Sequence, residues 1–138
     1  MASVEELQAY LRKSAGHSKS VIPCPPFHLY LHPTDDFRFY NYAIPDAPVD
    51  VLTAGELDAL RAAFEAHDRE MRLEFLHEYT PGLRTALDAL GFPLESENPL
   101  LVCTEASWQV VTGPPGLEVR RLHADSPDAE LAAAMNTA

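Results

Sequence analysis

Four ring-bearing side chains are spaced so that they could line a small-molecule pocket: His28, Tyr30, Tyr40 and Tyr42. In residues 27–32, apolar and polar or aromatic side chains alternate, which is the period of a half-buried strand. Residues 37–44 form a second aromatic-rich segment after a turn, so the two segments predict an antiparallel hairpin with the four rings on one face. Aromatic side chains on such a hairpin more often pack against a helix than hold a ligand. Both interpretations stay open.

The remaining histidines and cysteines do not form a recognisable catalytic or metal-binding pattern. His28 and His32 share a strand face, but four residues place them roughly 13 Å apart, too far for one metal ion. The two cysteines, Cys24 and Cys103, lie outside any Cys-x-x-Cys or Cys/His spacing. No Gly-x-Ser-x-Gly elbow is present. The sequence therefore predicts no catalytic residue and no metal site, and it favours reduced thiols.

The charge of the chain limits its partners. Its 138 residues carry 10 Lys and Arg against 21 Asp and Glu, a formal net charge of -11. Such a chain repels nucleic-acid phosphates and anionic lipid headgroups, so neither is an expected partner. No apolar run approaches the roughly 20 residues that span a bilayer, and the N-terminus lacks the pattern of a secretory signal. We expect a cytoplasmic protein.

Helix and strand signals alternate along the first 112 residues. Ser3 with Glu6 is a capping box that opens a helix ending near Lys13. Thr53 with Glu56 is a second capping box. The next elements are predicted from periodicity and from Pro and Gly signals: a strand at 72–76, a helix from Thr80 and Pro81 to Gly91 whose buried face includes Leu87, and strands at 92–97 and 99–104.

The end of the chain is predicted to belong to another unit. Gly113, Pro114, Pro115 and Gly116 are typical of a linker, and 117–122 has the composition of a strand. Ser126 and Pro127 then begin a helix that has no partner to cover its apolar side. We therefore expect one domain at 1–112, and a linker with the first strand and helix of a following domain at 113–138.

The order of these elements resembles the second half of the GNAT (Gcn5-related) N-acetyltransferase fold. Most of the likeness lies in 72–76 and in 83–92, where a strand leads into a helix that ends in Leu-Gly-Phe. Residues 41–46 and 99–104 are similar to the degenerate N-terminal domain of two-domain GNAT proteins. The resemblance implies an α+β fold, with a central, mostly antiparallel sheet flanked by helices. In intact GNAT domains the corresponding hairpin helps to wall the pocket of the acetyl acceptor.

Two departures from the family pattern concern acetyl-CoA, the cofactor expected for the full-length family. The family places an Arg/Gln-x-x-Gly-x-Gly/Ala loop before a helix whose N–H groups bind pyrophosphate. The matching residues, 45–55, contain one Gly, no Arg, two Pro and two Asp. The family also often has a Tyr as general acid where this chain has Leu87. The resemblance thus implies a chain that binds no cofactor by itself.

Three functions remain open at this stage. The first is the non-catalytic N-terminal part of a GNAT acetyltransferase, in which an intact partner domain transfers acetyl from acetyl-CoA to an amine. The second is a stand-alone module that binds a small molecule or another protein. The third is an active acetyltransferase that holds acetyl-CoA in another way. The expected partner is the missing C-terminal GNAT domain or a second copy of the chain, as a homodimer.

Overall fold

The computed structural model describes residues 2–109, 113–117 and 123. The chain divides into two units, Met1–Leu100 and Leu101–Ala138, and the regular elements of the described residues lie in the first. In chain order they are α1 (Val4–Gly16), β1 (Ser20–Cys24), β2 (Phe27–Leu31), the 3-10 helix η1 (Arg38–Tyr40), β3 (Tyr42–Pro45), α2 (Ala54–Glu65) and α3 (Pro81–Ala89).

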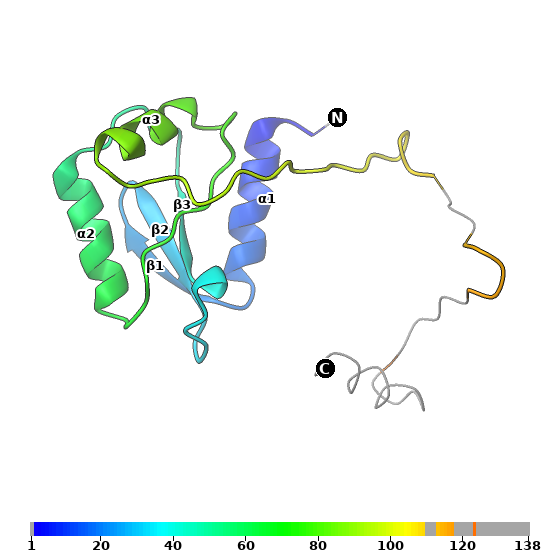
Figure 1. Cartoon of the computed structure of the whole chain (residues 1–138), viewed down its shortest axis with the longest axis horizontal. Helices are drawn as coiled ribbons and strands as arrows, with labels where there is room; N and C mark the ends of the chain where they lie inside the picture. The colour runs from blue at the N-terminus through cyan, green and yellow to red at the C-terminus, as the bar shows by residue number, and fades with distance from the viewer. Residues whose placement is uncertain (1, 110–112, 118–122, 124–138) are drawn as a thin grey trace. The chain divides into compact units, whose positions relative to one another are not determined.

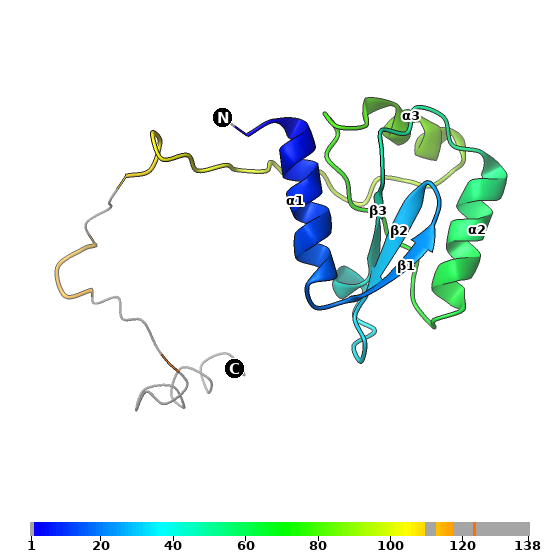
Figure 2. The same cartoon turned by 180° about the vertical axis from the view of Figure 1, so that it is seen from behind.

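The three strands form an antiparallel sheet in the order β1, β2, β3. The helices α1 and α2 lie on opposite sides of this sheet (Figures 1 and 2). Side chains of β2 alternate between the two sides because successive residues of a strand point to opposite faces. The prediction of an α+β fold with a mostly antiparallel sheet and flanking helices is confirmed.

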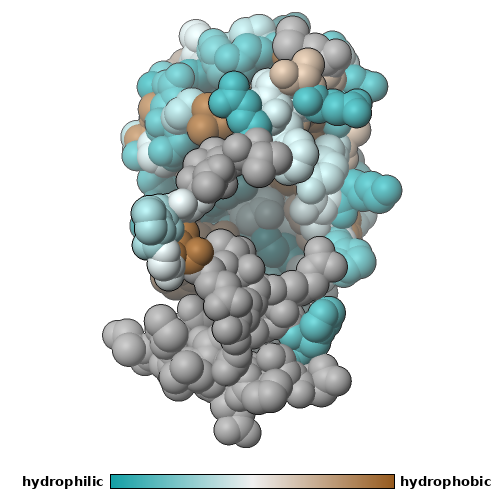
Figure 3. Space-filling view, turned by 90° about the vertical axis from the view of Figure 1, so that its right-hand side faces the viewer, coloured by the Kyte–Doolittle hydropathy of each residue, from teal (hydrophilic) through white to brown (hydrophobic). Residues whose placement is uncertain are grey.

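The main core lies between the sheet and α2. Leu57, Leu60 and Phe64 follow one another at helical spacing and are almost completely buried. They pack with residues of the sheet, of the loop before α2 and of α3: Phe27, Leu29, Leu31, Ala43, Val49, Leu52, Leu83 and Leu87. His67, which continues the same spacing, lies beyond the end of α2 and is exposed. Away from the core, hydrophilic residues predominate on the face drawn in Figure 3.

The helix boundaries agree well with the signals in the sequence. Both capping boxes are present: the side chains of Ser3 and Thr53 accept hydrogen bonds from the backbone N–H groups of Glu6 and Glu56, respectively. Gly91 follows α3 with φ +74°, a conformation that glycine adopts without a steric penalty. These signals are local in sequence, which is why they could be recognised without a structure.

The predicted strand at 37–44 is wrong in its first half. Residues 38–40 form η1, and the strand begins only at Tyr42. The reason is Asn41, which is fully buried and uses its amide to hold the preceding turn.

In addition, β1 was not predicted, because its Pro23 and the prolines after it are typical strand breakers. A proline is tolerated there because β1 is an edge strand.

The segment expected to be a strand at 72–76 pairs with β3 at one point only. Leu73 forms a parallel bridge with Ala43, whose backbone donates to the Arg72 carbonyl at 2.8 Å and accepts from Glu74 N–H at 2.9 Å. The strands expected at 92–97 and 99–104 are also wrong, because these residues have no regular structure. Residues 118–122 and 126–138 lie outside the described residues, and the boundary at 112 stays a prediction.

Candidate functional site

The start of α2 is the place where the family resemblance implies binding of pyrophosphate. Thr53 N–H donates to Glu56 Oε2 at 2.8 Å, and the Thr53 hydroxyl donates to the same oxygen at 2.7 Å. These hydrogen bonds lower the pKa of Glu56 below its ordinary value. A helix N-terminus attracts anions because its free N–H groups carry partial positive charge. Here the chain's own carboxylate already occupies that position.

This carboxylate predicts a specific pH dependence. Because the pKa of Glu56 is lowered in the folded state, its stabilising effect is complete above the unfolded pKa of about 4.3. The effect is lost as the pH falls through the folded pKa. We expect Glu56→Gln to flatten the loss of stability between about pH 5 and pH 2, measured as the urea midpoint. Glu65→Gln, at the other end of α2, is the matched control, and equal profiles for the wild type and Glu56→Gln would contradict the role of the cap.

The loop before α2 is packed onto the beginning of α3. Val49 N–H donates to Thr80 Oγ1 at 2.8 Å, and the Thr80 hydroxyl donates to the Val49 carbonyl at 3.1 Å. Thr80 was expected to cap α3, but its side chain makes no capping hydrogen bond. A Cβ on Gly82 would lie 2.8 Å from the Asp50 Cα, so only glycine allows this approach. The loop is therefore held closed against α3.

Side chains from α1 fill the space where β3 and the 70–76 segment diverge. Arg12 Nη1 donates to the carbonyls of Pro45 and Asp46, both at 3.1 Å. On the other side, Leu76 N–H donates to the buried Gln8 Oε1 at 3.2 Å. These two side chains satisfy backbone groups that neighbouring strands would otherwise pair. Neither role is visible in the sequence, because α1 shows only ordinary helical periodicity.

Three of the four predicted pocket residues lie together on the α1 side of the sheet. Tyr30 and Tyr42 are cross-strand partners with ring centroids 6.4 Å apart, and they pack with Ala15 of α1. His28 lies on the same face, where its Nδ1 is 2.5 Å from Asp46 Oδ1. Burial raises the pKa of both tyrosines, so they remain neutral phenols.

The fourth predicted residue, Tyr40, is in a different place. It belongs to η1 and lies against His32 and Phe37, at centroid distances of 5.9 Å and 5.2 Å. The expectation that all four rings share one sheet face is therefore wrong for Tyr40. The physical reason is that the chain leaves the strand conformation before Tyr42.

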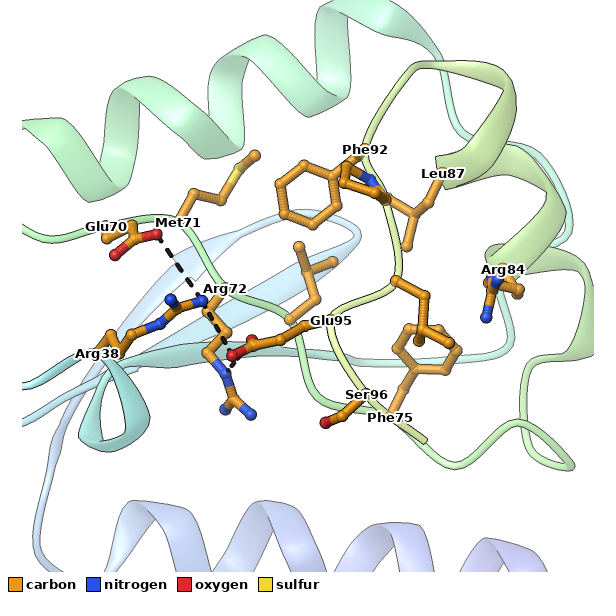
Figure 4. Close-up of a pocket in the computed structure, with 13 residues that line it drawn as sticks. Arg38, Glu70, Met71, Arg72, Phe75, Arg84, Leu87, Phe92, Glu95 and Ser96 are labelled. Atoms are coloured by element: carbon orange, nitrogen blue, oxygen red, sulfur yellow. Dashed lines mark hydrogen bonds and ion pairs between the residues drawn. The ribbon is translucent and has the colours of Figure 1, made fainter. Parts of the chain in front are cut away.

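The structure contains a pocket of about 260 Å³ that none of these four residues lines. Its wall comes from η1, the 70–75 segment, α3 and the 92–96 segment (Figure 4). The apolar part of the wall consists of Met71, Leu73, Phe75, Leu87, Phe92, Pro93 and Leu94. Apolar alternation at 71–75 was visible in the sequence, but the approach of 92–96 depends on the tertiary fold.

Charged residues line one end of this pocket. Glu95 lies between two arginines, with its carboxylate 3.0 Å from Arg38 Nη2 and 3.0 Å from Arg72 Nε (Figure 4). Arg72 also pairs with Glu74. Burial by itself would lower the pKa of Arg72, but the bonds to the two glutamates outweigh burial and raise it. The guanidinium therefore stays positively charged, and the carboxylates of Glu74 and Glu95 in the same chain balance its charge.

The described residues offer little support for other chemistry. Burial raises the pKa of Cys24, which keeps this side chain a thiol rather than a reactive thiolate. Among the residues with described positions, no group of three or more His, Cys, Asp and Glu side chains could hold a metal ion. In the same part of the chain, no helix has the length and apolar character needed to cross a bilayer.

Comparison with known proteins identifies the architecture. No protein-family model matches the sequence, and no curated protein shows significant similarity to it. A solved GCN5-related N-acetyltransferase from Kribbella flavida is similar to 98% of this chain, with a TM-score of 0.79 and 24% sequence identity. The chain has the GNAT fold. It covers 53% of the Kribbella flavida chain, so it spans about half the length of that GNAT protein.

Proposed function

We propose that this chain is the non-catalytic N-terminal part of a GNAT acetyltransferase. In this proposal, a partner domain with an intact GNAT site binds acetyl-CoA and transfers the acetyl group to an amine. The present chain packs against that domain and stabilises it, and the acetyl transfer takes place in the partner domain. The likeness to about half of a longer GNAT protein supports this arrangement. We also propose a cytoplasmic location, in which Cys24 and Cys103 stay reduced as the free thiols that they are in the structure.

The observation that carries the proposal is the carboxylate of Glu56 at the start of α2. A phosphate at this helix end would lie beside the Glu56 carboxylate, which is already bonded to the Thr53 N–H and hydroxyl groups. Neighbouring like charges repel each other. Val49 and Thr80 also hold the preceding loop closed. The residues present therefore do not fit the pyrophosphate of acetyl-CoA.

The residue that would serve as general acid also argues against catalysis. Leu87 replaces the Tyr that the family often carries, and its side chain is only 4% exposed within the main core. An aliphatic side chain has no proton to give to a departing thiolate. Packing has taken the place of proton transfer at this position.

Titration with acetyl-CoA by isothermal calorimetry tests the proposal directly. We expect no binding to the full chain at ligand concentrations up to about 1 mM, which corresponds to a binding free energy weaker than about -4 kcal/mol. We also expect no release of free thiol when acetyl-CoA and a panel of amines are added. Saturable binding with a micromolar Kd would contradict the proposal and favour an active enzyme.

A second measurement separates the bracing role from a stand-alone binding module. Adding this chain to the catalytic GNAT domain that the proposal requires should raise the turnover of that domain. The Thr80→Val variant lacks the hydroxyl that holds the loop at Val49. It tests whether the increase in turnover depends on the closed loop of this chain. Unchanged turnover on adding the wild-type chain would favour the stand-alone module.

A further inference from the structure

A short segment between β2 and β3 displays an unusual group of exposed aromatic rings. We call residues 32–41 the aromatic loop. Within it, Phe37, Phe39 and Tyr40 are 50%, 46% and 47% exposed. The rings contact one another, since Phe37 lies 5.3 Å from Phe39 and 5.2 Å from Tyr40 between centroids. Single exposed apolar residues are common, but a contiguous group of them is typical of an interaction site.

The aromatic loop is held in place by one buried side chain. Asn41 is 0% exposed, and its Nδ2 donates to the carbonyls of Asp35 and Phe37 at 3.0 Å and 2.9 Å. Its Oδ1 accepts from His32 N–H at 2.8 Å and from Arg69 Nε at 3.3 Å. The amide thus makes all four hydrogen bonds that it is able to make. The loop is fixed by polar contacts inside, and its rings are left outside.

This construction suits a binding surface better than a structural turn. Ordering a flexible side chain at an interface costs about 0.5–1.5 kcal/mol. Rings that already contact one another on a fixed loop avoid much of this cost. Tyr and Arg are among the residues that contribute most to protein interfaces, and Arg38 lies within the same loop. A fully satisfied buried amide also specifies one loop conformation.

The rings are surrounded by charges of both signs. The guanidinium groups of Arg38 and Arg72 lie 5.4 Å and 4.9 Å from the centroid of the Phe39 ring. Arg38 also pairs with Glu95 at 3.0 Å and with Glu70 at 3.9 Å. The result is an apolar centre with a charged rim, which is the usual anatomy of a protein–protein interface.

We infer that the aromatic loop and its charged rim form the surface through which two copies of this chain associate. In a two-fold contact the same patch occurs on both sides, so it must be complementary to itself. A patch that carries both arginines and glutamates meets this condition, because the exposed Arg38–Glu70 pair, 3.9 Å apart within one chain, can exchange partners with the same pair of a second copy. Elsewhere, a chain with a net charge of -11 repels its own copy. This inference goes beyond the proposed function and does not depend on acetyl-CoA.

Sedimentation velocity of the full chain over a range of concentrations tests this inference. We expect the wild type to form a dimer and Tyr40→Ser to raise its Kd at least about tenfold. The matched control is Tyr10→Ser, the same change at a side chain of α1 that is 67% exposed, which should leave the Kd unchanged.

Three results would overturn the inference. The first is a wild-type chain that stays monomeric up to about 1 mM, since such weak association has no specific interface. The second is a dimer that tolerates Tyr40→Ser, and the third is a dimer weakened equally by Tyr10→Ser. Urea unfolding of Tyr40→Ser excludes misfolding as the cause. The acetyl-CoA titration is independent of the dimer measurement, so failure of one proposal does not imply failure of the other.

Discussion

Replacing Phe64 by alanine should lower the free energy of unfolding by about 4 kcal/mol. Phe64 is 0% exposed and lies in the centre of the main core, between α2 and the sheet. Its removal loses the burial of an aromatic ring and leaves a cavity that close-packed neighbours fill only in part. Domains of this size are stable by only about 5–15 kcal/mol. A large fraction of the variant molecules should therefore be unfolded at urea concentrations well below the wild-type midpoint. Urea unfolding followed by circular dichroism measures the change.

The matched control is Phe37→Ala, the same substitution at a ring that is 50% exposed. It should lower the free energy of unfolding by less than about 1 kcal/mol, because little buried surface is lost. Similar losses for the two variants would show that α2 does not pack on the sheet as described. The same Phe37→Ala protein should also dimerise more weakly, which separates a binding role from a structural one.

Replacing Asn41 by alanine should lower the free energy of unfolding by about 3 kcal/mol. The change removes the hydrogen-bond partner of His32 N–H and of the Asp35 carbonyl, whereas the Phe37 carbonyl loses one of two donors and keeps Tyr40 N–H. An unsatisfied buried polar group costs about 1–3 kcal/mol, and water entering the loop recovers part of the loss. Thermal unfolding measures the stability, and limited proteolysis shows whether residues 33–40 become accessible.

Asn98→Ala is the matched control for this prediction. Asn98 is exposed, and its Nδ2 donates only to Ser96 Oγ at 3.3 Å, so its removal should change stability by less than about 0.5 kcal/mol. If Asn41→Ala were equally mild, the amide would not be what holds the aromatic loop. The proposed dimer surface would then lose the preorganisation on which it rests.

Much of the candidate site could be predicted from the sequence, but some of the contacts that form it are seen only in the structure. The sequence showed that 45–55 lacks the glycines and the arginine of a phosphate loop. The capping box of Thr53 and Glu56 was also visible in the sequence, but the hydrogen bonds by which Thr80 closes the loop were not. The four predicted pocket residues were divided between two places, because the local turn around Asn41 interrupts the strand pattern.

The sequence by itself determined the features that depend on contacts between residues close together in the chain. The capping boxes at Ser3 and Thr53, the alternation in β2 and the stop at Gly91 involve contacts within a few residues, so their residue types and spacing suffice. The order of these elements was enough to suggest the GNAT fold, which the structural similarity then confirmed.

The tertiary structure alone decided what depends on contacts between distant segments. The segment at 70–76 pairs with β3 only at Ala43, because Arg12 and Gln8 of α1 take the backbone groups that lie beyond. The residues at 92–104 remain without regular structure, although their composition favours strands. Strand formation requires a partner with free backbone groups, and the position of that partner is set by the whole fold rather than by local sequence.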